Sequence, residues 1–237
     1  MLLAVFMWAA VWFLPDDKLH IVFCDVGQGD AILVSKGTTQ MLVDGGPDGE
    51  VLKCLARHIP FWDRRIEAVV LTHNESDHAR GLEYVRQRYN VMLYEPKLTK
   101  GEKLVVGPMT MDILWPDEKV LGASFSGEIN TTGVVGKISF GQFDVLLTAD
   151  VDPANYPQVT DVEVVKVPHH GSKYQWNFGW WDKVHADLAV ISVGKNSYGH
   201  PTPEVIEGLK DLGIKYLRTD QAGDVEIISD GRTWRVK

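Results

Sequence analysis

A run of metal-binding side chains directly after an apolar stretch constrains this chain more than any other feature of its sequence. Residues 67–73 read EAVVLTH, which is typical of a buried strand that ends at a histidine. Four potential ligands then fall within six residues, namely His73, Glu75, Asp77 and His78. Residues two apart at a strand end point to one side, and the following turn can direct the next side chains into the same cavity. Imidazole and carboxylate together suit transition metals, so the cluster predicts a metal centre, with a solvated polar turn as the alternative.

Two further strand ends supply candidate ligands. The run FDVLLTAD closes at Asp150, which alone is a weak signal because Asp also suits turns. The segment VPHHGS follows the apolar run VEVVKV and places His169 and His170 in a loop, where imidazoles that hydrogen-bond locally are the alternative. We expect Asp150 and at least one of these histidines within about 8 Å of His78, because ligands of ions about 4 Å apart cannot be further separated.

The remaining pattern predicts a layered α/β sandwich with a β-rich start and finish. Strands are predicted at residues 19–24, 31–35, 40–44, 67–73, 110–115, 136–140, 144–148, 162–167, 187–192, 215–219, 224–229 and 233–236. Helices are predicted at residues 49–59, 77–89, 177–184 and 203–212. The first three strands, separated by glycine-containing turns, are expected to form an antiparallel meander. Residues 19–237 therefore read as one domain without internal repeats.

Charge and cysteine content narrow the function and the compartment. The net charge of -8 argues against broad, sequence-independent binding to nucleic acid, although two divalent ions would add positive charge where an anionic substrate docks. Cys24 and Cys54 lie in apolar runs and are expected to be two buried thiols; one disulfide stays open for an exported domain.

Residues 1–14, MLLAVFMWAAVWFL, form an uncharged segment that should avoid water. As a helix they would span about 21 Å, short of the roughly 30 Å hydrocarbon core. We rank the end of a membrane anchor first, an uncleaved export signal second and a buried element third, and expect the segment to pack poorly against the domain. The expected location is membrane-associated or extracytoplasmic, with a cytoplasmic one left open.

In combination these motifs resemble the metallo-β-lactamase superfamily. The spacing His73-x-Glu75-x-Asp77-His78 is similar to its HxHxDH signature, with Glu in place of the middle His. The closest resemblance is to the C-terminal hydrolase domain of ComEC-type competence DNA-uptake proteins and their stand-alone relatives, over roughly residues 19 to 236. It rests on FCDVGQGDAILV, LVDGG, LTHNESDHARG, LLTAD, VPHHGS and NSYGHP.

The resemblance implies a four-layer αββα sandwich that binds two divalent ions, Zn²⁺ or Mn²⁺. His73 and Glu75 would hold one ion; Asp77, His78 and one of His169 and His170 would hold the other; Asp150 would bridge them. Asp44 would act behind the ligands. His200, for which a turn histidine is the alternative, would lie near the substrate and move protons, so the catalytic residues implied are Asp77, Asp150 and His200. Asp25, Gln28 and Asp30 match the family without an implied role.

Two departures from the family pattern leave the first metal site in question. Residues 130–133 read NTTG where the family usually has an Asn-Ser stretch, and Ala149 replaces the usual Gly. The sequence favours a metal-dependent phosphodiesterase or nuclease acting on single-stranded DNA. Its alternatives are a hydrolase of a small phosphoester, ester, thioester, lactone or lactam at the same site, and a non-catalytic domain that binds metal or a partner. No protein partner is inferred.

Overall fold

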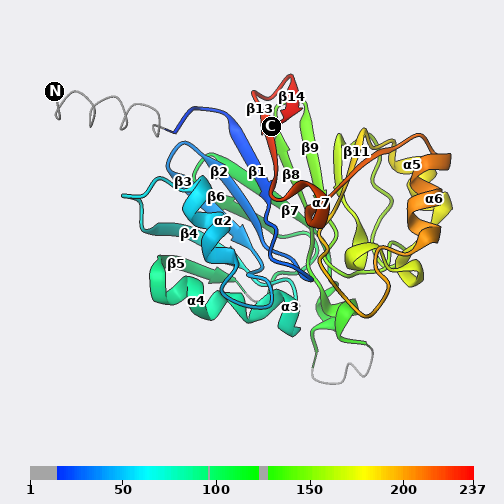
Figure 1. Cartoon of the computed structure of the whole chain (residues 1–237), viewed down its shortest axis with the longest axis horizontal. Coiled ribbons are helices and arrows are strands. Elements are labelled where there is room, and N and C mark those ends of the chain that lie inside the picture. Colours follow the sequence, from blue (N-terminus) through cyan, green and yellow to red (C-terminus); the bar gives the residue numbers. More distant parts are fainter. Residues whose placement is uncertain (1–14, 96, 123–127) are drawn as a thin grey trace.

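Two seven-stranded sheets dominate the computed structural model, which describes residues 15–95, 97–122 and 128–237 (Figure 1). The first sheet contains, in spatial order, β14 (Trp234–Val236), β13 (Val225–Ser229), β1 (Leu19–Phe23), β2 (Ile32–Lys36), β3 (Thr39–Val43), β4 (Arg65–Val70) and β5 (Asn90–Glu95). The second contains β12 (Lys215–Arg218), β11 (Leu188–Ile191), β10 (Val164–Lys166), β9 (Phe143–Leu147), β8 (Val135–Phe140), β7 (Met109–Trp115) and β6 (Lys103–Val106).

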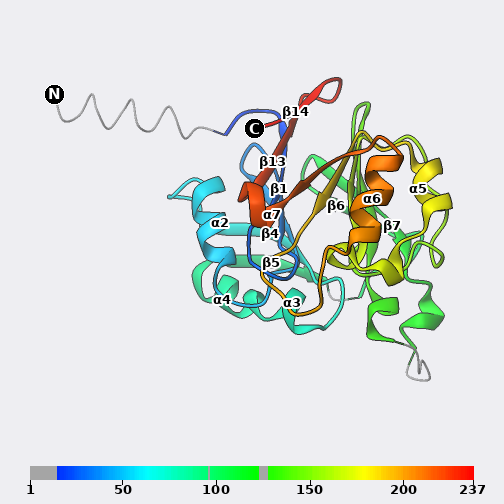
Figure 2. The same cartoon turned by 45° about the vertical axis from the view of Figure 1, so that its right-hand side comes forward.

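Helices cover the outer face of each sheet, as the two views of the ribbon show (Figures 1 and 2). The first sheet carries α2 (Val51–His58) and α4 (Gly81–Arg88), and the second carries α5 (Phe178–Val184) and α6 (Pro203–Asp211). A central core, which includes Ile21 and Val190, fills the space between the sheets, and each helical layer has a core of its own. The four-layer αββα sandwich expected from the motifs is therefore confirmed.

Short helical segments connect these layers. They are α3 (Ser76–Ala79), α7 (Thr219–Ala222) and 3₁₀ turns at Glu118–Val120, Ile129–Thr132, Pro168–Gly171 and Lys173–Gln175. The antiparallel meander β1–β2–β3 matches the prediction, but β5 and β6 were not predicted. Both are edge strands; β5 is exposed or half-buried throughout, whereas β6 alternates exposed and buried residues but is only four residues long.

Strand direction explains why polar loops gather at one end of the molecule. In the first sheet β3, β4 and β5 are parallel, and in the second β9, β10, β11 and β12 are parallel. The carboxyl ends of parallel neighbours share one edge of a sheet, and such edges are the usual place for ligand sites in α/β folds. The segments after β3, β4, β9 and β10 are the ones in which the sequence places its candidate ligands.

Cys24 and Cys54 form a disulfide, so the expectation of two buried thiols was wrong. Spacing along the chain could not show the pairing, because it depends on how α2 packs on the first sheet; the two Cα atoms lie 5.7 Å apart, within the usual range for a disulfide. Residues 1–14, for which an anchor or export signal was expected, lie outside the described residues. None of the helices in the described ranges has the length and apolarity needed to cross a bilayer.

Replacing both cysteines by alanine should lower the free energy of unfolding by about 3–4 kcal/mol, because the bridge closes a loop across a sequence separation of 30. Denaturant titration of the variant and of the oxidised wild type measures the difference. The wild type treated with reductant should approach the variant. Finding two alkylatable thiols in the unreduced native protein would contradict the assignment.

Candidate metal centre

Six candidate ligands from the two sheets converge on one centre. The residues are His73, Glu75, Asp77 and His78, which follow β4, and Asp150 and His170, which follow β9 and β10. His78 Nε2 lies 3.3 Å and His170 Nε2 3.5 Å from Asp150 Oδ2, while His170 Nε2 lies 3.4 Å from Asp77 Oδ2. The structure thus brings Asp150 and His78 well within the distance that adjoining metal sites require.

The six side chains form two donor groups that share one carboxylate. In the first group, His73, Glu75 and Asp150 offer ligand atoms that all lie within 4.8 Å of one another. The second group, with the same spacing, consists of Asp77, His78, Asp150 and His170. Since only Asp150 belongs to both, its position suits a carboxylate that bridges two ions; its role as a ligand, like the others, stays a prediction.

Unpartnered atoms at the centre fit divalent ions. The Nε2 atoms of His73, His78 and His170 and both carboxylate oxygens of Asp150 are buried without a hydrogen-bond partner among the described residues. A buried polar group without a partner costs about 1–3 kcal/mol, so five such atoms at one point need a shared explanation. Ligation of metal ions by imidazole nitrogen and carboxylate oxygen provides it.

The opposite ring nitrogens are held by the protein. His78 Nδ1 lies 2.8 Å from Asp44 Oδ2, and His170 Nδ1 lies 2.8 Å from the carbonyl oxygen of Ser192, so each can donate its N–H there. His73 Nδ1 lies 3.0 Å from Thr72 Oγ1, which itself donates to Asp44. Partners on Nδ1 leave the Nε2 lone pairs directed at the centre, as in other metal sites built from histidine.

Asp44 supports, from behind, the ligand loop that follows β4. Its carboxylate accepts hydrogen bonds from Thr72 N at 2.8 Å and Thr72 Oγ1 at 2.7 Å, besides its contact with His78. Asp44 itself has a left-handed backbone (φ 60°), which a carboxylate residue tolerates better than most. These contacts support the role behind the ligands that the resemblance implied for Asp44.

The buried charges complement one another. Burial works against the carboxylate of Asp150, but His170, His78 and Lys166 outweigh it and hold its pKa well below the usual range. Burial likewise opposes the charged form of His78, and Asp150 and Asp44 raise its pKa well above the usual value. The pKa of Asp77 falls to about 2, because its contacts with His170 and His78 overcome partial burial. The carboxylates of Asp77 and Asp150 are therefore favoured in the ionised form, which is the form that binds cations.

The structure separates the two adjacent histidines. His170 is 1% exposed and belongs to the second donor group, whereas His169 turns its Nδ1 to Gln175 Oε1 at 2.9 Å and lines the adjacent cavity. His169 Nε2 still lies 3.7 Å from Asp150 Oδ2. Both histidines have left-handed backbones (φ 47° and 54°), as has Ala149 (φ 47°) before the shared carboxylate. Backbone strain of about 1–3 kcal/mol per residue is typical of functional sites.

The loop between β1 and β2 supports the ligand loop, which gives the FCDVGQGD motif a structural role. Asp30 N donates to the carbonyl oxygen of Asp77 at 3.1 Å, and a Cβ on Gly29 would collide with that same oxygen. Gln28 lines the cavity, whereas Asp25 is held away from it by a hydrogen bond from its backbone N to Asp224.

Sequence analysis missed Lys166, which lies at the end of β10 and was read only as part of an apolar strand. Its side chain is fully buried, and Nζ lies 2.7 Å from Asp30 Oδ2 and 3.6 Å from Asp150 Oδ1. A lysine within an apolar run directly before VPHHGS was the available signal, because Lys is almost never fully buried unless paired.

A cavity of about 710 Å³ opens beside the centre. Its lining includes Glu75, Asp77, Asn130, His169, His170, Lys195, Tyr198 and His200. His200 Nδ1 is buried without a partner among the described residues; burial, followed by the neighbouring His169, lowers the pKa of its imidazole to about 4. Asn196 positions the loop, since its Oδ1 accepts from His200 N and its Nδ2 donates to His200 O.

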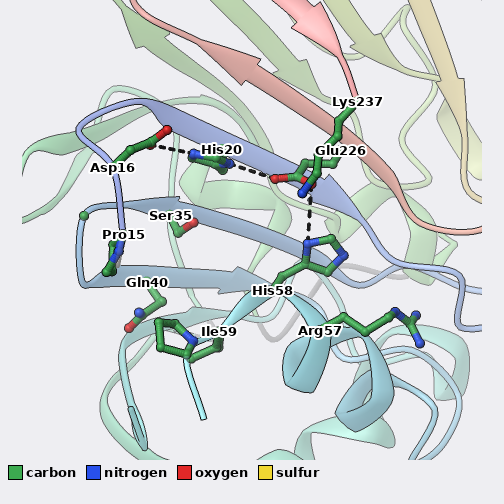
Figure 3. A pocket seen from close by; sticks show the side chains of 12 residues that line it. Pro15, Asp16, His20, Ser35, Gln40, Arg57, His58, Ile59, Glu226 and Lys237 are labelled. Carbon is green, nitrogen blue, oxygen red and sulfur yellow. Dashed lines mark hydrogen bonds and ion pairs between the residues drawn. The ribbon is translucent and has the colours of Figure 1, made fainter. Parts of the chain in front are cut away.

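A second cavity, beside the start of β1 and the end of α2, differs in its chemistry (Figure 3). Its ionisable groups are paired with one another: His20 lies between Asp16 and Glu226 at 2.8 Å from each, and Lys237 lies 2.8 Å from Glu226. Hydrogen bonds with His20 and Lys237 overcome burial and lower the pKa of Glu226 to about 2. Satisfied ion pairs indicate a structural cluster, in contrast to the unpartnered atoms of the metal centre.

Glu226→Gln should make the protein less stable at neutral pH by about 1–2 kcal/mol, a value reduced for solvent screening. The folded-state pKa of about 2 lies below the ordinary 4.5, so this carboxylate stabilises the fold above pH 4.5 and loses its effect as the pH falls towards 2. The difference between variant and wild type should therefore shrink with acid. Denaturant titrations from pH 3 to 7 measure it, with exposed Glu207→Gln as the control; a difference independent of pH would contradict the linkage.

The amino-acid sequence is similar to a known protein family and to several curated proteins. A sequence model described as the metallo-beta-lactamase superfamily matches residues 24–178. Competence protein ComA of Neisseria gonorrhoeae is 26% identical over 90% of this chain and 32% of its own length, and ComE operon protein 3 of Bacillus subtilis is 26% identical over 85% of this chain and 32% of its own. The chain thus spans about a third of the length of these curated relatives.

Solved structures share the architecture at low sequence identity. The metallo-beta-lactamase fold protein YhfI from Bacillus subtilis superposes with a TM-score of 0.58 and 13% identity, over 90% of this chain and 100% of that one. Zn²⁺-bound PqqB from Methylobacterium extorquens gives a TM-score of 0.59 and 12% identity, over 84% and 97%. At these identities the likeness establishes the fold.

Proposed function

Because this chain belongs to the metallo-beta-lactamase superfamily of hydrolases, we propose that it is a metal-dependent phosphodiesterase that acts on DNA. The observation that carries the proposal is the set of unpartnered, buried Nε2 and carboxylate atoms gathered around Asp150 beside an open cavity. Such an arrangement suits two adjoining ions and leaves room for a substrate at their side.

The chain's own residues would divide the work by position. His73, Glu75 and Asp150 would hold one ion, and Asp77, His78, Asp150 and His170 the other. When bound, Zn²⁺ or Mn²⁺ would activate a water molecule and neutralise charge on a phosphoryl group. Asp44 and the Ser192 carbonyl fix the rings of His78 and His170 beforehand, so little reorganisation is needed during reaction. His200 lines the cavity wall and would transfer a proton there.

Two features of the cavity rim support a nucleic-acid substrate. Lys195 is exposed at the rim and would attract a phosphate, while Tyr198, 73% exposed, presents a ring on which a base could stack. One relative, ComA of Neisseria gonorrhoeae, is named a competence protein, which agrees with the resemblance to competence DNA-uptake proteins and favours DNA over a small ester. Single-stranded DNA is the form whose bases are free to stack.

Purified protein, depleted of metal and reloaded with Mn²⁺ or Zn²⁺ separately, should be assayed on labelled single-stranded DNA, duplex DNA, bis-p-nitrophenyl phosphate and a thioester. We expect DNA and bis-p-nitrophenyl phosphate, the two classes of phosphodiester, to be cleaved only when metal is supplied. Turnover of the thioester alone would replace the proposal by a small-ester hydrolase. Stoichiometric metal binding without turnover of any substrate would indicate a binding domain.

Tyr198→Ala should weaken cleavage of single-stranded DNA while sparing bis-p-nitrophenyl phosphate, which has no base to stack. Loss of one stacking contact, about 1–3 kcal/mol, should raise KM for DNA on the order of tenfold. Tyr174→Ala is the matched control, since Tyr174 is 78% exposed but does not line the cavity. Equal losses on both substrates would argue against a stacking role.

We propose further that the domain works outside the cytoplasm, membrane-associated through residues 1–14. The support for an oxidising compartment is the Cys24–Cys54 disulfide, because reducing conditions disfavour such bonds. A thiol-alkylation assay on intact cells that express the chain tests the location: an oxidised disulfide in the native host agrees with it, and free thiols would contradict it.

A further inference from the structure

A buried ion pair crosses between the two sheets directly behind the candidate metal centre. Asp30 lies in the loop between β1 and β2 of the first sheet, whereas Lys166 ends β10 of the second, and their charged atoms are 2.7 Å apart. Both side chains are at most 1% exposed. A pair so deeply buried costs several kcal/mol of desolvation per ion, so it is weak evidence for stability alone and raises the question of its role.

Asp30 and Lys166 contact different ligand loops of the centre. Asp30 donates its backbone N–H to Asp77, and its carboxylate oxygens lie 3.7 Å from His78 Nδ1 and 3.6 Å from His170 Nδ1. On the other side, Lys166 Nζ donates to the carbonyl oxygen of Ala149 at 2.8 Å and lies 3.6 Å from Asp150 Oδ1. The ion pair therefore links the loop that carries Asp77 to the one that carries Asp150.

Resting on the proposed metal site, we propose that Lys166 and Asp30 are positioning residues that fix the ligands of one sheet against the shared carboxylate Asp150 of the other. The donor groups contain atoms from both sheets, so their spacing depends on how the sheets are held together at this edge. The core between the sheets consists of apolar side chains, which resist sliding less specifically than a buried ion pair.

Charge balance agrees with this assignment. Five carboxylates, from Asp30, Asp44, Glu75, Asp77 and Asp150, gather around the centre. Two divalent ions and Lys166 would together offset them. Lys166 Nζ lies next to two of these carboxylates, 2.7 Å from Asp30 Oδ2 and 3.6 Å from Asp150 Oδ1.

Positioning and electrostatics predict opposite results for Lys166→Met. If the lysine acted only through its charge, removing a cation would strengthen the binding of divalent ions by Coulomb's law. If it holds Asp150 in place, its loss should weaken metal binding by about 10–100-fold, as for other residues that orient ligands. We expect the weakening, and we expect Lys137→Met, which removes a lysine paired with Asp144 in the same sheet, to have no effect.

The measurement is Mn²⁺ binding to metal-depleted protein by calorimetry, with electron paramagnetic resonance to distinguish two coupled ions from isolated ones. Wild type that binds no Mn²⁺ or Zn²⁺ would overturn the proposed function. Wild type that binds two ions, with Lys166→Met binding them equally or more tightly, would overturn only the present inference. Thermal melting of the metal-free variants separates unfolding from loss of a positioned ligand.

Because Lys166→Met leaves Asp30 unpaired, it can fail to fold, and Asp30→Asn combined with Lys166→Gln removes both charges while keeping polar partners. This double variant preserves the net charge of the centre. Because its net charge equals that of the wild type, a purely electrostatic role predicts unchanged Mn²⁺ affinity, whereas we expect weaker binding, since a neutral amide pair holds the two loops less firmly than the ion pair. Mn²⁺ affinity equal to that of the wild type would overturn the proposal.

Discussion

Asp150→Asn should abolish hydrolysis and strip the centre of metal while the fold remains intact. The amide keeps the shape of the carboxylate but loses the anion that both donor groups share, and its NH₂ group presents hydrogens where a ligand oxygen is needed. Loss of bound ions removes several kcal/mol of stabilisation of the reaction, so the rate should fall about 10³-fold or more. Metal analysis and phosphodiesterase rate on the same samples provide the decisive readings.

A matched control for this experiment lies in β9, the strand that precedes Asp150. Asp144→Asn changes an aspartate of β9 that pairs with Lys137 at 2.7 Å and takes no part in either donor group, so it should keep metal and activity. Asp77→Asn should lower metal binding and hydrolysis nearly as strongly as Asp150→Asn, but it should affect the second donor group alone. Full metal content and full activity in Asp150→Asn would refute the mechanism.

His200→Ala should behave differently, lowering turnover by about 10²–10⁴-fold while metal content is retained. The residue lines the substrate cavity but belongs to neither donor group, and its Nδ1 is buried without a partner among the described residues. Its backbone is held on both sides by Asn196, so removal of the ring should leave the loop in place. Steady-state rates with parallel metal analysis measure the effect.

A control variant and a second substrate test the role of His200. His185→Ala removes an exposed histidine paired with Asp161, outside the cavity lining, and should leave turnover unchanged. A bis-p-nitrophenyl phosphate substrate needs little help to expel its leaving group, so a deficit much larger on DNA than on this ester would indicate that His200 acts at the departing oxygen. If His200→Ala loses metal instead, the residue belongs with the ligands.

The strand-end ligands were predictable because their signals are local. His73, Glu75, Asp77 and His78 follow one buried strand within six residues, and Asp150 and His170 each close another. Apolar runs indicate which segments are buried, and parallel packing brings the carboxyl ends of such strands to one edge of the sheet. The same logic gave the antiparallel meander and the four principal helices. It overlooked two edge strands, β5, which is exposed or half-buried throughout, and β6, which is only four residues long.

Other properties depended on contacts that no local pattern encodes. The different surroundings of His169 and His170 go with two successive left-handed residues: His170 Nε2 lies near Asp77 and Asp150, whereas His169 Nδ1 lies near Gln175. The disulfide joins residues 24 and 54 through the packing of α2 on its sheet.

The sequence by itself determined the family, the layered fold and the candidate metal ligands, because strand periodicity and ligand spacing are properties of short segments. Only the tertiary structure decided which atoms face one another across the two sheets. Lys166 reads as one polar residue in an apolar strand, and Asp30 as one acidic residue in a glycine-rich loop. They become an ion pair behind the metal centre because the sheets stack face to face, and that stacking joins residues far apart in the chain.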